Sequence, residues 1–531
     1  MNLADRVRVW SRRRPDRDAL ADDHRALSYA DLAAEVDGLT RSLRHRLDVG
    51  PGDRLAVLAS NRVETFVTLF AAARLGAIVV PLNTRLAPAE LAWILGDAEP
   101  TVLVAEAALL SPLADHVAST PGAPPLPTLV DPDRDWPALT RAEAAGVVEQ
   151  SAGPEPSPEG TLADDVLVVY TSGTTGHPKG AVLTQAAVAA NAVNAVHFVD
   201  LRADDVTLGV LPLFHVGGLN MIAVPALLSG AAVRLHGRFD PDRWLSDVER
   251  HRPAHSILVP AMMAAVIGRP GWERADLSSL RLLVTGSTFV PPSLIEAFHA
   301  RGVPVCQIYG ATETSPIALH QRVDEAFDHV GTVGQEAVAS ELRIVTPSGP
   351  GSDREFVDVA PGEPGELWVR GANVFRGYWR NEEATAAALT DDGWFRTGDV
   401  GYRRDDGHVV ICDRLKDMLI SGGENVYPAE LEQLLDEMDE IAEATVIGVP
   451  DERWGEVAMA LIVLRPGHQL DRATVLGRFD GRLARFKHPR HVRFVDSLPR
   501  NAMGKVRKSD LRVAIADDAS AMVDDASGAP A

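Results

Sequence analysis

Apolar and polar positions alternate along the first hundred residues in a way that predicts helices and strands in turn. Residues 63–75 are mostly apolar and end at Gly76, a residue that tolerates the left-handed conformation of a helix C-cap, so we predict a helix there. The short apolar runs 78–80 and 101–104 predict buried strands. This alternation predicts an α/β fold in layers, with buried strands.

Two helix starts carry the capping-box pattern. Ser28 is followed three residues later by Asp31, and Asn61 by Glu64, so we expect the first residue of each pair to cap a helix. Residues 88–95 are also expected to be helical. Residues 119–163 are rich in Pro, Ala, Asp and Glu, which predicts surface connections.

The pattern changes twice further along the chain. Strands are expected at 166–170, 282–284 and 303–308, whereas the frequent Gly and Pro of 329–410 predict a small β-rich subdomain. After Cys412 the chain predicts a compact α+β domain, with helices at 428–438 and 473–483 and strands at 444–449, 457–464 and 492–495. We therefore expect a large N-terminal domain (1–412) of layered α/β subdomains plus the β-rich subdomain, a hinge (413–417), a small mobile C-terminal domain (418–513) and a disordered tail (514–531).

Composition narrows the class of protein. Of 531 residues, 46 % are hydrophobic and 24 % charged, which is typical of a folded globular chain. The formal net charge of −22 disfavours a nucleic-acid or membrane-surface partner. The two cysteines exclude a disulfide framework and fit a reducing cytoplasm. With no targeting signal and no apolar run of the ~18 residues that span a bilayer, we expect a cytoplasmic protein without membrane insertion.

The strongest chemical signal is the segment 171–180, which directly follows a predicted strand. Its hydroxyls, glycines and lysine can surround phosphate oxygens, because backbone N–H groups in such loops point at anions. It is not the P-loop of kinases, since Gly-Lys-Ser/Thr is absent, and an ordinary Gly/Ser/Thr loop is the alternative. The candidate ligands are Thr171, Ser172, Gly173, Thr174, Thr175, Gly176 and Lys179.

Further segments suit a nucleotide and a metal ion. Residues 307–314 end a predicted strand with a ring that can stack on a purine, a hydroxyl and the carboxylate of Glu313, a ligand type that Mg²⁺ prefers. Asp399 follows a tight turn and could bond a ribose diol. Residues 413–417 lie at the composition break, and Lys505 follows a glycine near the end. Each segment alone is more often a solvated turn or a surface ion pair.

Taken together and in this order, the segments resemble the motifs of the adenylate-forming superfamily of acyl-CoA synthetases, stand-alone adenylation domains and firefly-type luciferases. The resemblance covers about residues 3–511, and the run 420–428 is typical of the acyl-CoA and aryl-CoA synthetase branch. It implies two steps. A carboxylate attacks the α-phosphate of ATP to give acyl-AMP and pyrophosphate, and the thiol of CoA then displaces AMP. ATP, Mg²⁺ and CoA are the cofactors implied.

The resemblance also implies roles for single residues in the ATP site. The 171–180 loop would hold the β- and γ-phosphates and Glu313 the Mg²⁺. Lys505 would be the mobile lysine that bridges the carboxylate and the α-phosphate, where a fixed positive charge offsets charge that builds up in the transition state. Other implied ATP or AMP contacts are Ser287, Tyr309 on the adenine, Gly310, Ala311, Thr312 on the α-phosphate, and Asp399 with Arg414 on the ribose. Ser287 lies in a Thr-Gly-Ser-Thr-Phe turn where many relatives have a Gly-Gly-Ala-Pro-like turn.

The resemblance places His215 as the gate between the acyl site and the thiol channel. The acyl pocket would be lined by Val216, Gly217, Leu219 and Gly310. Lys416 occupies the position of the hinge. The CoA contacts implied are Gly422, Gly423, Trp454, Phe486, Lys487 and Arg490, with Gly423 bare because a side chain would block a narrow tunnel. The alternative is that Lys487 and Arg490 are ordinary surface residues.

The motifs are compatible with four functions, of which an acid:CoA ligase is favoured. The others are an adenylating enzyme that serves a carrier-protein thiol or performs one half-reaction, a luciferase-like oxygenase, and a non-enzymatic nucleotide sensor. His215 stands after Phe214, where amino-acid-activating relatives usually carry Asp, which argues against amino acids. Residues 215–224 contain no Lys or Arg, so we expect an apolar, bulky monocarboxylic acid as the small-molecule partner. A homodimer stays open.

Overall fold

A computed structural model describes residues 2–141, 160–171, 178–287, 290–346, 356–421, 424–451, 453–500 and 506–517. The chain divides into two compact units. The first unit comprises residues 1–342 and 368–396, and the second comprises 343–367 and 397–531.

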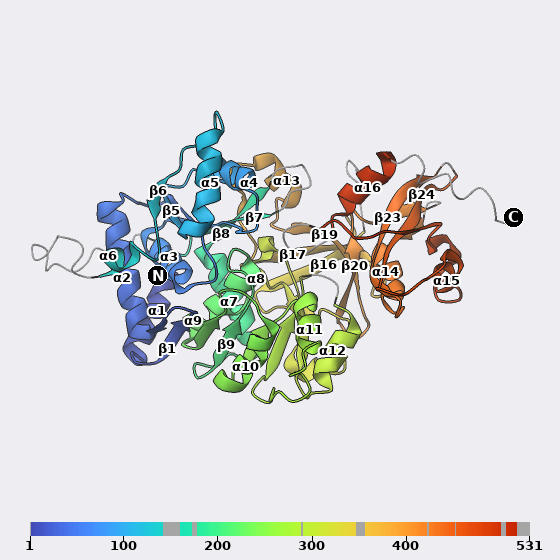
Figure 1. Cartoon of the computed structure of the whole chain (residues 1–531), viewed down its shortest axis with the longest axis horizontal. Helices are drawn as coiled ribbons and strands as arrows, with labels where there is room; N and C mark the ends of the chain where they lie inside the picture. Colours follow the sequence, from blue (N-terminus) through green and yellow to red (C-terminus); the bar gives the residue numbers. More distant parts are fainter. Residues whose placement is uncertain are drawn as a thin grey trace, which may run out of the picture. The chain divides into compact units, whose positions relative to one another are not determined.

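Two sheets form the framework of the first unit (Figure 1). One has the strand order β18-β8-β7-β4-β3-β5-β6, in which β3, β4, β5 and β6 run parallel. Its strands are β3 (Arg54–Leu58), β4 (Ile78–Pro81), β5 (Val102–Ala105), β6 (Thr128–Val130), β7 (Asp165–Thr171), β8 (Lys179–Thr184) and β18 (Gly377–Tyr378).

The other sheet has the order β15-β14-β13-β12-β11-β9-β10-β1-β2, with a parallel run from β13 to β1. Its strands are β1 (Asp18–Ala21), β2 (Ala26–Ser28), β9 (Val206–Gly209), β10 (Ala232–Leu235), β11 (His255–Ile257), β12 (Leu282–Thr285), β13 (Val305–Tyr309), β14 (Leu319–His320) and β15 (Gln335–Glu336). Parallel neighbours place their carboxyl ends at one edge, where ligands bind in open α/β sheets.

Helices cover both sheets. Those of the first unit are α1 (Leu3–Arg13), α2 (Tyr29–Arg46), α3 (Val63–Leu75), α4 (Pro88–Ala98), α5 (Ala107–Ser119), α6 (Trp136–Thr140), α7 (Gln185–Val199), α8 (Val216–Leu219), α9 (Ala223–Ser229), α10 (Pro241–His251), α11 (Pro260–Ile267), α12 (Pro292–His299), α13 (Glu382–Ala388), and the 3₁₀ turns η2 (Thr312–Thr314) and η3 (Val323–Glu325).

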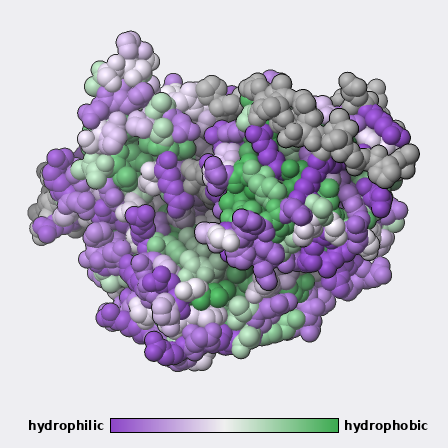
Figure 2. Space-filling model, turned by 45° about the vertical axis from the view of Figure 1, so that its right-hand side comes forward, coloured by the Kyte–Doolittle hydropathy of each residue, from purple (hydrophilic) through white to green (hydrophobic). Residues whose placement is uncertain are grey.

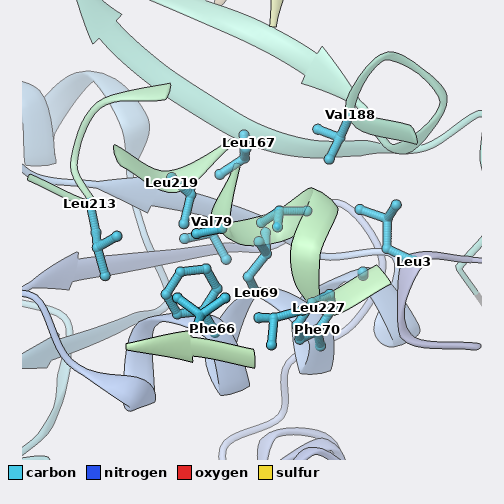
Figure 3. Packing of buried hydrophobic residues seen from close by; sticks show 14 of the residues in the cluster. Leu3, Phe66, Leu69, Phe70, Val79, Leu167, Val188, Leu213, Leu219 and Leu227 are labelled. Carbon is cyan, nitrogen blue, oxygen red and sulfur yellow. The ribbon is translucent and has the colours of Figure 1, made fainter. Parts of the chain in front are cut away.

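The main core of the first unit joins the two sheets. Every residue of α3 except Arg74 is buried, so this helix is an inner layer rather than an amphipathic cover. Its Phe66, Leu69 and Phe70 pack with Val79 and Leu167 from one sheet and with Leu219 and Leu227 from α8 and α9 (Figure 3). Smaller clusters fill the outer faces, under α4 and α5 on one sheet and under α10, α11 and α12 on the other.

A further sheet has the order β16-β17-β19-β20. The sequence boundaries between the two units fall within β16, β17 and β19. The second unit then continues into a sheet with the order β22-β21-β24-β23, with β25 parallel to β24. Leu431 and Leu435 of α14 pack in one cluster of this sheet, and Leu511 and Ile515 of α16 in another. The elements are β16 (Ser340–Val345), β17 (Gly365–Gly371), β19 (Phe395–Arg403), β20 (Val409–Arg414), β21 (Leu419–Ser421), β22 (Glu424–Val426), α14 (Pro428–Asp436), β23 (Ile441–Asp451), β24 (Gly455–Leu464), α15 (Arg472–Gly477), η4 (Arg485–Lys487), β25 (His491–Phe494) and α16 (Lys508–Asp517).

The predicted α/β class is confirmed, and so are most elements. The helix at 63–75 has its predicted bounds and ends at Gly76 with φ +73°. Ser28 caps α2 and forms the predicted capping box with Asp31. The β-rich segment predicted at 329–410 contains the strands β15 to β20, together with the helix α13.

Four local predictions were wrong. Asn61 does not cap α3, because the N-cap is Arg62 and Asn61 bonds elsewhere. The 119–163 segment is more than a connection, since β6 extends a sheet and α6 lies on α2. The helix expected at 473–483 ends at Gly477, and Gly481 follows with φ +72°. The helix α16 includes residues 514–517 of the expected tail.

Hydrophilic residues form much of the face seen in Figure 2, with hydrophobic residues visible in a few groups between them. A charged fraction of 24 % accounts for this appearance. In the part of the chain that the structure describes, no helix combines the length and the apolar character needed to cross a bilayer.

Candidate functional site

The segment that follows β13 is the centre of the candidate site in the first unit. Tyr309 ends the strand with its side chain buried, and η2 begins three residues later with Thr312. Between them, a Cβ on Gly310 would lie 1.7 Å from the backbone oxygen of Pro316. Only glycine allows this close approach, so the loop must fold tightly back on itself.

Buried asparagines hold this loop from three directions. The amide of Asn373 donates to the backbone oxygens of Thr314 and Ile317, at 2.9 Å each. Asn220, directly after α8, donates to the oxygen of Ser315, and Asn191 of α7 donates to the oxygen of Asn220. Because buried backbone groups need partners, these side chains fix the loop after Tyr309 to α7 and α8.

Glu313 is buried within η2 and has an aromatic partner. The hydroxyl of Tyr378 donates to its carboxylate at 2.8 Å, and Lys179 lies over the Tyr378 ring with its Nζ 5.5 Å from the ring centre. Phe375 also donates its backbone N–H to the Glu313 backbone oxygen. The structure thus brings together Glu313 and Lys179, which lie 134 residues apart in the sequence.

His215 is the residue before α8 and is largely buried. Burial lowers the pKa of its ring to about 4, with a smaller effect from the positive charge of Arg85. Its ring contacts Phe214 edge-on, with centroids 4.6 Å apart. At neutral pH the imidazole is therefore uncharged, which suits a residue beside an apolar ligand rather than an anion.

The short helix α8 presents the predicted acyl pocket residues. Val216 and Leu219 are buried, and a Cβ on Gly217 would have its nearest contact at 3.7 Å, from Leu211. On Gly218, by contrast, a Cβ would lie 2.2 Å from the Pro212 oxygen. Of these two glycines, Gly217 could accept a Cβ at ordinary contact distance, whereas Gly218 is required by packing.

The turn after β12 approaches the same strand. Ser287 has a left-handed backbone, with φ +72°, and a Cβ on Gly286 would lie 2.8 Å from the oxygen of Ile308 in β13. The predicted nucleotide contacts Ser287, Gly310 and Ala311 therefore lie at the carboxyl ends of two neighbouring parallel strands. This is the edge at which α/β sheets bind ligands.

In the second unit, Asp399 and Arg414 form the pair that the sequence predicted. They face each other in β19 and β20, and Arg414 Nε lies 3.0 Å from Asp399 Oδ1. The Asp399 side chain is buried whereas Arg414 is exposed. The expected tight turn directly before Asp399 is wrong, because Gly398 and Asp399 both lie inside β19; Gly398 has φ +69° there and its N–H donates to Glu366.

The candidate CoA residues fall into two groups. Arg490 lies over the ring of Trp454, with its guanidinium carbon 5.2 Å from the ring centre. Phe486 and Lys487 lie in η4, which packs beside β22. Lys487 is paired with Glu430 of α14, at 2.7 Å, while Phe486 is exposed. Arg490 is thus the more available cation of the two.

Several predicted residues lie outside the described residues. These are Ser172, Gly173, Thr174, Thr175, Gly176, Gly422, Gly423 and Lys505. Their neighbours Thr171 and Lys179 end β7 and begin β8, two antiparallel strands, so the segment predicted to hold phosphates lies between these strands in the sequence. Lys416 lies in an exposed turn after β20.

Sequence reasoning missed three residues that shape the site. Tyr378 and Asn373 reach Glu313 and its loop from a segment about 60 residues away. Asn61 donates to the oxygens of Leu211 and His236 and accepts from the N–H of Leu213, so it fixes the loop that leads to His215. The Asn61–Glu64 spacing drew attention to Asn61 but suggested a cap. No sequence signal marked the other two.

Two family models match successive parts of the chain. Residues 7–379 match the AMP-binding enzyme family, and residues 430–505 match the AMP-binding enzyme C-terminal domain. An indoleacetate–CoA ligase of Aromatoleum aromaticum is 46 % identical over 506 residues, which cover 94 % of this chain and 96 % of that protein. A feruloyl-CoA synthase of Amycolatopsis is 40 % identical, covering 92 % and 94 %.

Solved structures of CoA synthetases and of MatB share the fold of this chain over nearly its whole length. The ATP-bound MatB of Rhodopseudomonas palustris superposes with a TM-score of 0.83 at 32 % identity, covering 97 % of this chain and 99 % of that one. The o-succinylbenzoate CoA synthetase of Bacillus subtilis, in complex with its acyl-adenylate intermediate, gives 0.82 at 29 % identity, covering 96 % and 97 %.

The fold and the sequence matches define an adenylate-forming enzyme, and the chain belongs to the AMP-binding enzyme family. Within that family it is a member of the acyl-CoA and aryl-CoA synthetase branch. The favoured prediction from the sequence is confirmed: the protein is an AMP-forming acid:CoA ligase, with a carboxylic acid, ATP and CoA as its substrates.

Proposed function

We propose that this ligase activates an apolar, bulky carboxylic acid with an aromatic ring. The observation that carries the proposal is the apolar segment after His215. Val216, Leu219 and Met221 are buried there, a Cβ on Gly217 would meet only Leu211, at 3.7 Å, and His215 is held neutral. Such surroundings favour burial of a ring, and residues 215–224 themselves contain no Lys or Arg to pair with a second carboxylate. Two of the relatives are named for aromatic acids, indoleacetate and ferulate.

For the ATP half of the site, we propose the roles that the sequence implies. The loop 171–180 holds the β- and γ-phosphates, Tyr309 stacks on adenine, and Thr312 bonds the α-phosphate. Asp399 and Arg414 bind the ribose. Their ion pair supports this role, because a carboxylate held in place by a guanidinium is a fixed acceptor for a diol.

We propose that Glu313 binds Mg²⁺. The donor set fits, since Mg²⁺ prefers oxygen ligands and Glu313 and Thr312 offer a carboxylate and a hydroxyl next to each other in η2. When bound, Mg²⁺ neutralises charge on the phosphates of ATP. Tyr378 orients the Glu313 carboxylate by its hydrogen bond, and Lys179 lies over the Tyr378 ring, with its Nζ 5.5 Å from the ring centre.

The remaining roles belong to the C-terminal residues. We propose Lys505 as the lysine of the adenylation step and Trp454, Phe486, Lys487 and Arg490, with Gly422 and Gly423, as contacts of CoA. We also propose the division at a hinge around Lys416, between a domain of residues 1–412 and one of 418–513. A homodimer and a cytoplasmic location stay predictions.

The test is a panel of carboxylic acids assayed for pyrophosphate release with ATP and Mg²⁺. Indoleacetate, phenylacetate and hydroxycinnamates are compared with octanoate, succinate and malonate. We expect an aromatic monocarboxylic acid to give the highest kcat/KM. Faster turnover of malonate than of every apolar acid would overturn the proposal for the acid and leave the ligase class in place.

A second assay fixes the thiol acceptor. Thioester formation is measured with CoA and, separately, with a phosphopantetheine-loaded carrier protein. We expect CoA to be used with the lower KM. Exclusive use of the carrier protein would favour the alternative function that the sequence left open.

A further inference from the structure

A cavity of about 490 Å³ opens on the first unit, and no residue assigned above lines it. It is lined by Arg14, Arg17, Asp18, Val206, Ala232, Arg234, Arg250 and His251. These residues come from the end of α1, from the neighbouring strands β1, β10 and β9, and from the end of α10. The volume lies within the range of ~300–1,000 Å³ that small-molecule sites occupy.

The cavity lies at the opposite edge of the sheet from the ATP residues. Asp18, Val206 and Ala232 are the first residues of three adjacent strands that run parallel, so the cavity is at their amino ends. Tyr309 ends β13, a strand with the same direction in that sheet. A ligand in the cavity would therefore not occupy the adenylation site.

The lining is strongly basic although the whole chain carries a net charge of −22. Four guanidinium groups face one lining carboxylate, Asp18, which lies 3.4 Å from Arg234. Arg14 pairs with Asp204, a residue just outside the lining, and Arg17 lies 3.9 Å from the same carboxylate. Asp247 lies 3.7 Å from the His251 ring and is itself paired with Arg243. Four arginines against Asp18 and Asp204 leave the lining with an excess of positive charge, which attracts anions.

Two of these arginines, Arg17 and Arg250, have N–H groups without a hydrogen-bond partner among the described residues. The Nε of Arg17 is buried and has no hydrogen-bond partner, although its NH2 donates to the backbone oxygen of Asp205. Among the described residues, no hydrogen bond or ion pair involves the guanidinium of Arg250. Burial and the charge of Arg234 lower the pKa of His251, so at neutral pH it adds a polar ring rather than a charge. A buried donor without a partner, such as the Nε of Arg17, is unfavourable until an acceptor arrives, whereas the Arg250 side chain is exposed.

We propose that this cavity is a second binding site, for a small molecule that carries a diphosphate or triphosphate group. Arginine forks match phosphate oxygens in pairs, and four guanidinium groups around one cavity offer donors for more than one phosphate. A single carboxylate would leave most of the donors unpaired. The proposal does not depend on which acid the enzyme activates.

The test is hydrogen–deuterium exchange of the full-length enzyme with added inorganic pyrophosphate, and with ATP and CoA in separate arms. Pyrophosphate also suits the 171–180 loop, so the location of protection decides. We expect slower exchange in peptides that cover residues 14–21 and 232–251. The arm with the strongest protection there identifies the source of the phosphates.

The Arg17→Gln/Arg234→Gln double variant should raise the concentration needed for half-maximal protection at least tenfold. Arg202→Gln is the matched control, because Arg202 is an exposed arginine paired with Asp200 outside the cavity. Since all three arginines are partly exposed, we expect the variants to fold, and adenylation activity verifies this. Protection confined to 171–180, or protection at 14–21 unchanged in the double variant, would overturn the proposal.

Discussion

The contact between Tyr378 and Glu313 makes the proposed magnesium site testable one atom at a time. Glu313→Gln keeps the shape of the side chain and removes its charge, so we expect the Mg²⁺ concentration for half-maximal pyrophosphate release to rise about a hundredfold. Tyr378→Phe removes only the hydrogen bond that orients the carboxylate, and an effect of about tenfold is expected. Both constants come from Mg²⁺ titrations at saturating ATP.

Glu383→Gln is the control for that experiment, because Glu383 is an exposed carboxylate in the first turn of α13. Its Mg²⁺ dependence should match that of the wild type. If the Glu313 variant also keeps the wild-type dependence, the metal is held by other groups and the role assigned to Glu313 is wrong.

Buried histidines should make the stability of the protein fall in mild acid. Burial lowers the pKa of His255 and His320 to about 4 from an ordinary value of 6.5. The unfolded chain therefore binds protons that the native state does not, so stability is complete above pH 6.5 and is lost as the pH falls toward 4. Each histidine contributes a loss of about 2 kcal/mol between pH 7 and pH 5.

Urea unfolding at pH 7 and pH 5 measures this difference. His255→Gln should reduce the loss of unfolding free energy between pH 7 and pH 5 by about 2 kcal/mol, the contribution of one histidine. This difference does not depend on how the substitution changes stability at pH 7. The exposed His45 serves as the control, and His45→Gln should leave the dependence unchanged. The prediction is contradicted if the wild type and the His255 variant lose the same unfolding free energy between pH 7 and pH 5.

At the scale of elements, two glycines in the first unit separate packing from binding. Gly310→Ala places a Cβ 1.7 Å from the Pro316 oxygen, so the loop from Tyr309 to Thr314 must move. We expect a cost of about 1–3 kcal/mol in stability and a severe loss of adenylation. Thermal unfolding and pyrophosphate release give the two quantities.

Gly217→Ala is the matched change, since its Cβ meets nothing closer than 3.7 Å. Stability should stay within about 0.5 kcal/mol of the wild type, while the preference shifts toward smaller acids. A shift in KM for bulky acids without a change in kcat for small ones identifies the acyl pocket. An unchanged acid preference would place the pocket elsewhere.

Elements also show where sequence patterns mislead. The Ser28–Asp31 pair predicted a capping box correctly, because the two residues are three positions apart and the hydrogen bonds between them are local. The same pattern failed at Asn61, whose amide is used by the backbone of Leu211, Leu213 and His236 instead. A distant backbone that needs donors and acceptors can outweigh a local cap.

For the molecule as a whole, the resemblance predicts that the two half-reactions depend on different residues of the second unit. Lys505→Ala should abolish pyrophosphate release and spare thioester formation from synthetic acyl-AMP. Gly423→Leu should do the reverse, because its side chain would fill the thiol tunnel without touching ATP. The two half-reactions are assayed separately for each variant.

Thioester formation from acyl-AMP in the Lys505 variant also shows that the enzyme folds, and pyrophosphate release does so for the Gly423 variant. Each variant is thus the control for the other. Equal loss of both half-reactions in both variants would speak for a single static site and against a hinge at residues 413–417.

The sequence by itself determined the class of fold, the family and the order of the ATP motifs. These features depend on short stretches: a hydrophobic period decides helix or strand, a glycine ends α3, and the ten residues 171–180 are enough to predict a phosphate-binding segment. The Asp399–Arg414 pair could also be foreseen, through the resemblance, although the two residues meet only because β19 and β20 are neighbours.

Only the tertiary structure decided which distant groups share an environment. Tyr378 on Glu313, Asn373 on the loop after Tyr309, and the arginine-lined cavity at the amino ends of β1, β9 and β10 have no local signal. The same holds for the neutral state of His215, which follows from burial. Side-chain contacts, desolvation and cavities arise from the packing of segments that are far apart in the chain, so a linear pattern does not encode them.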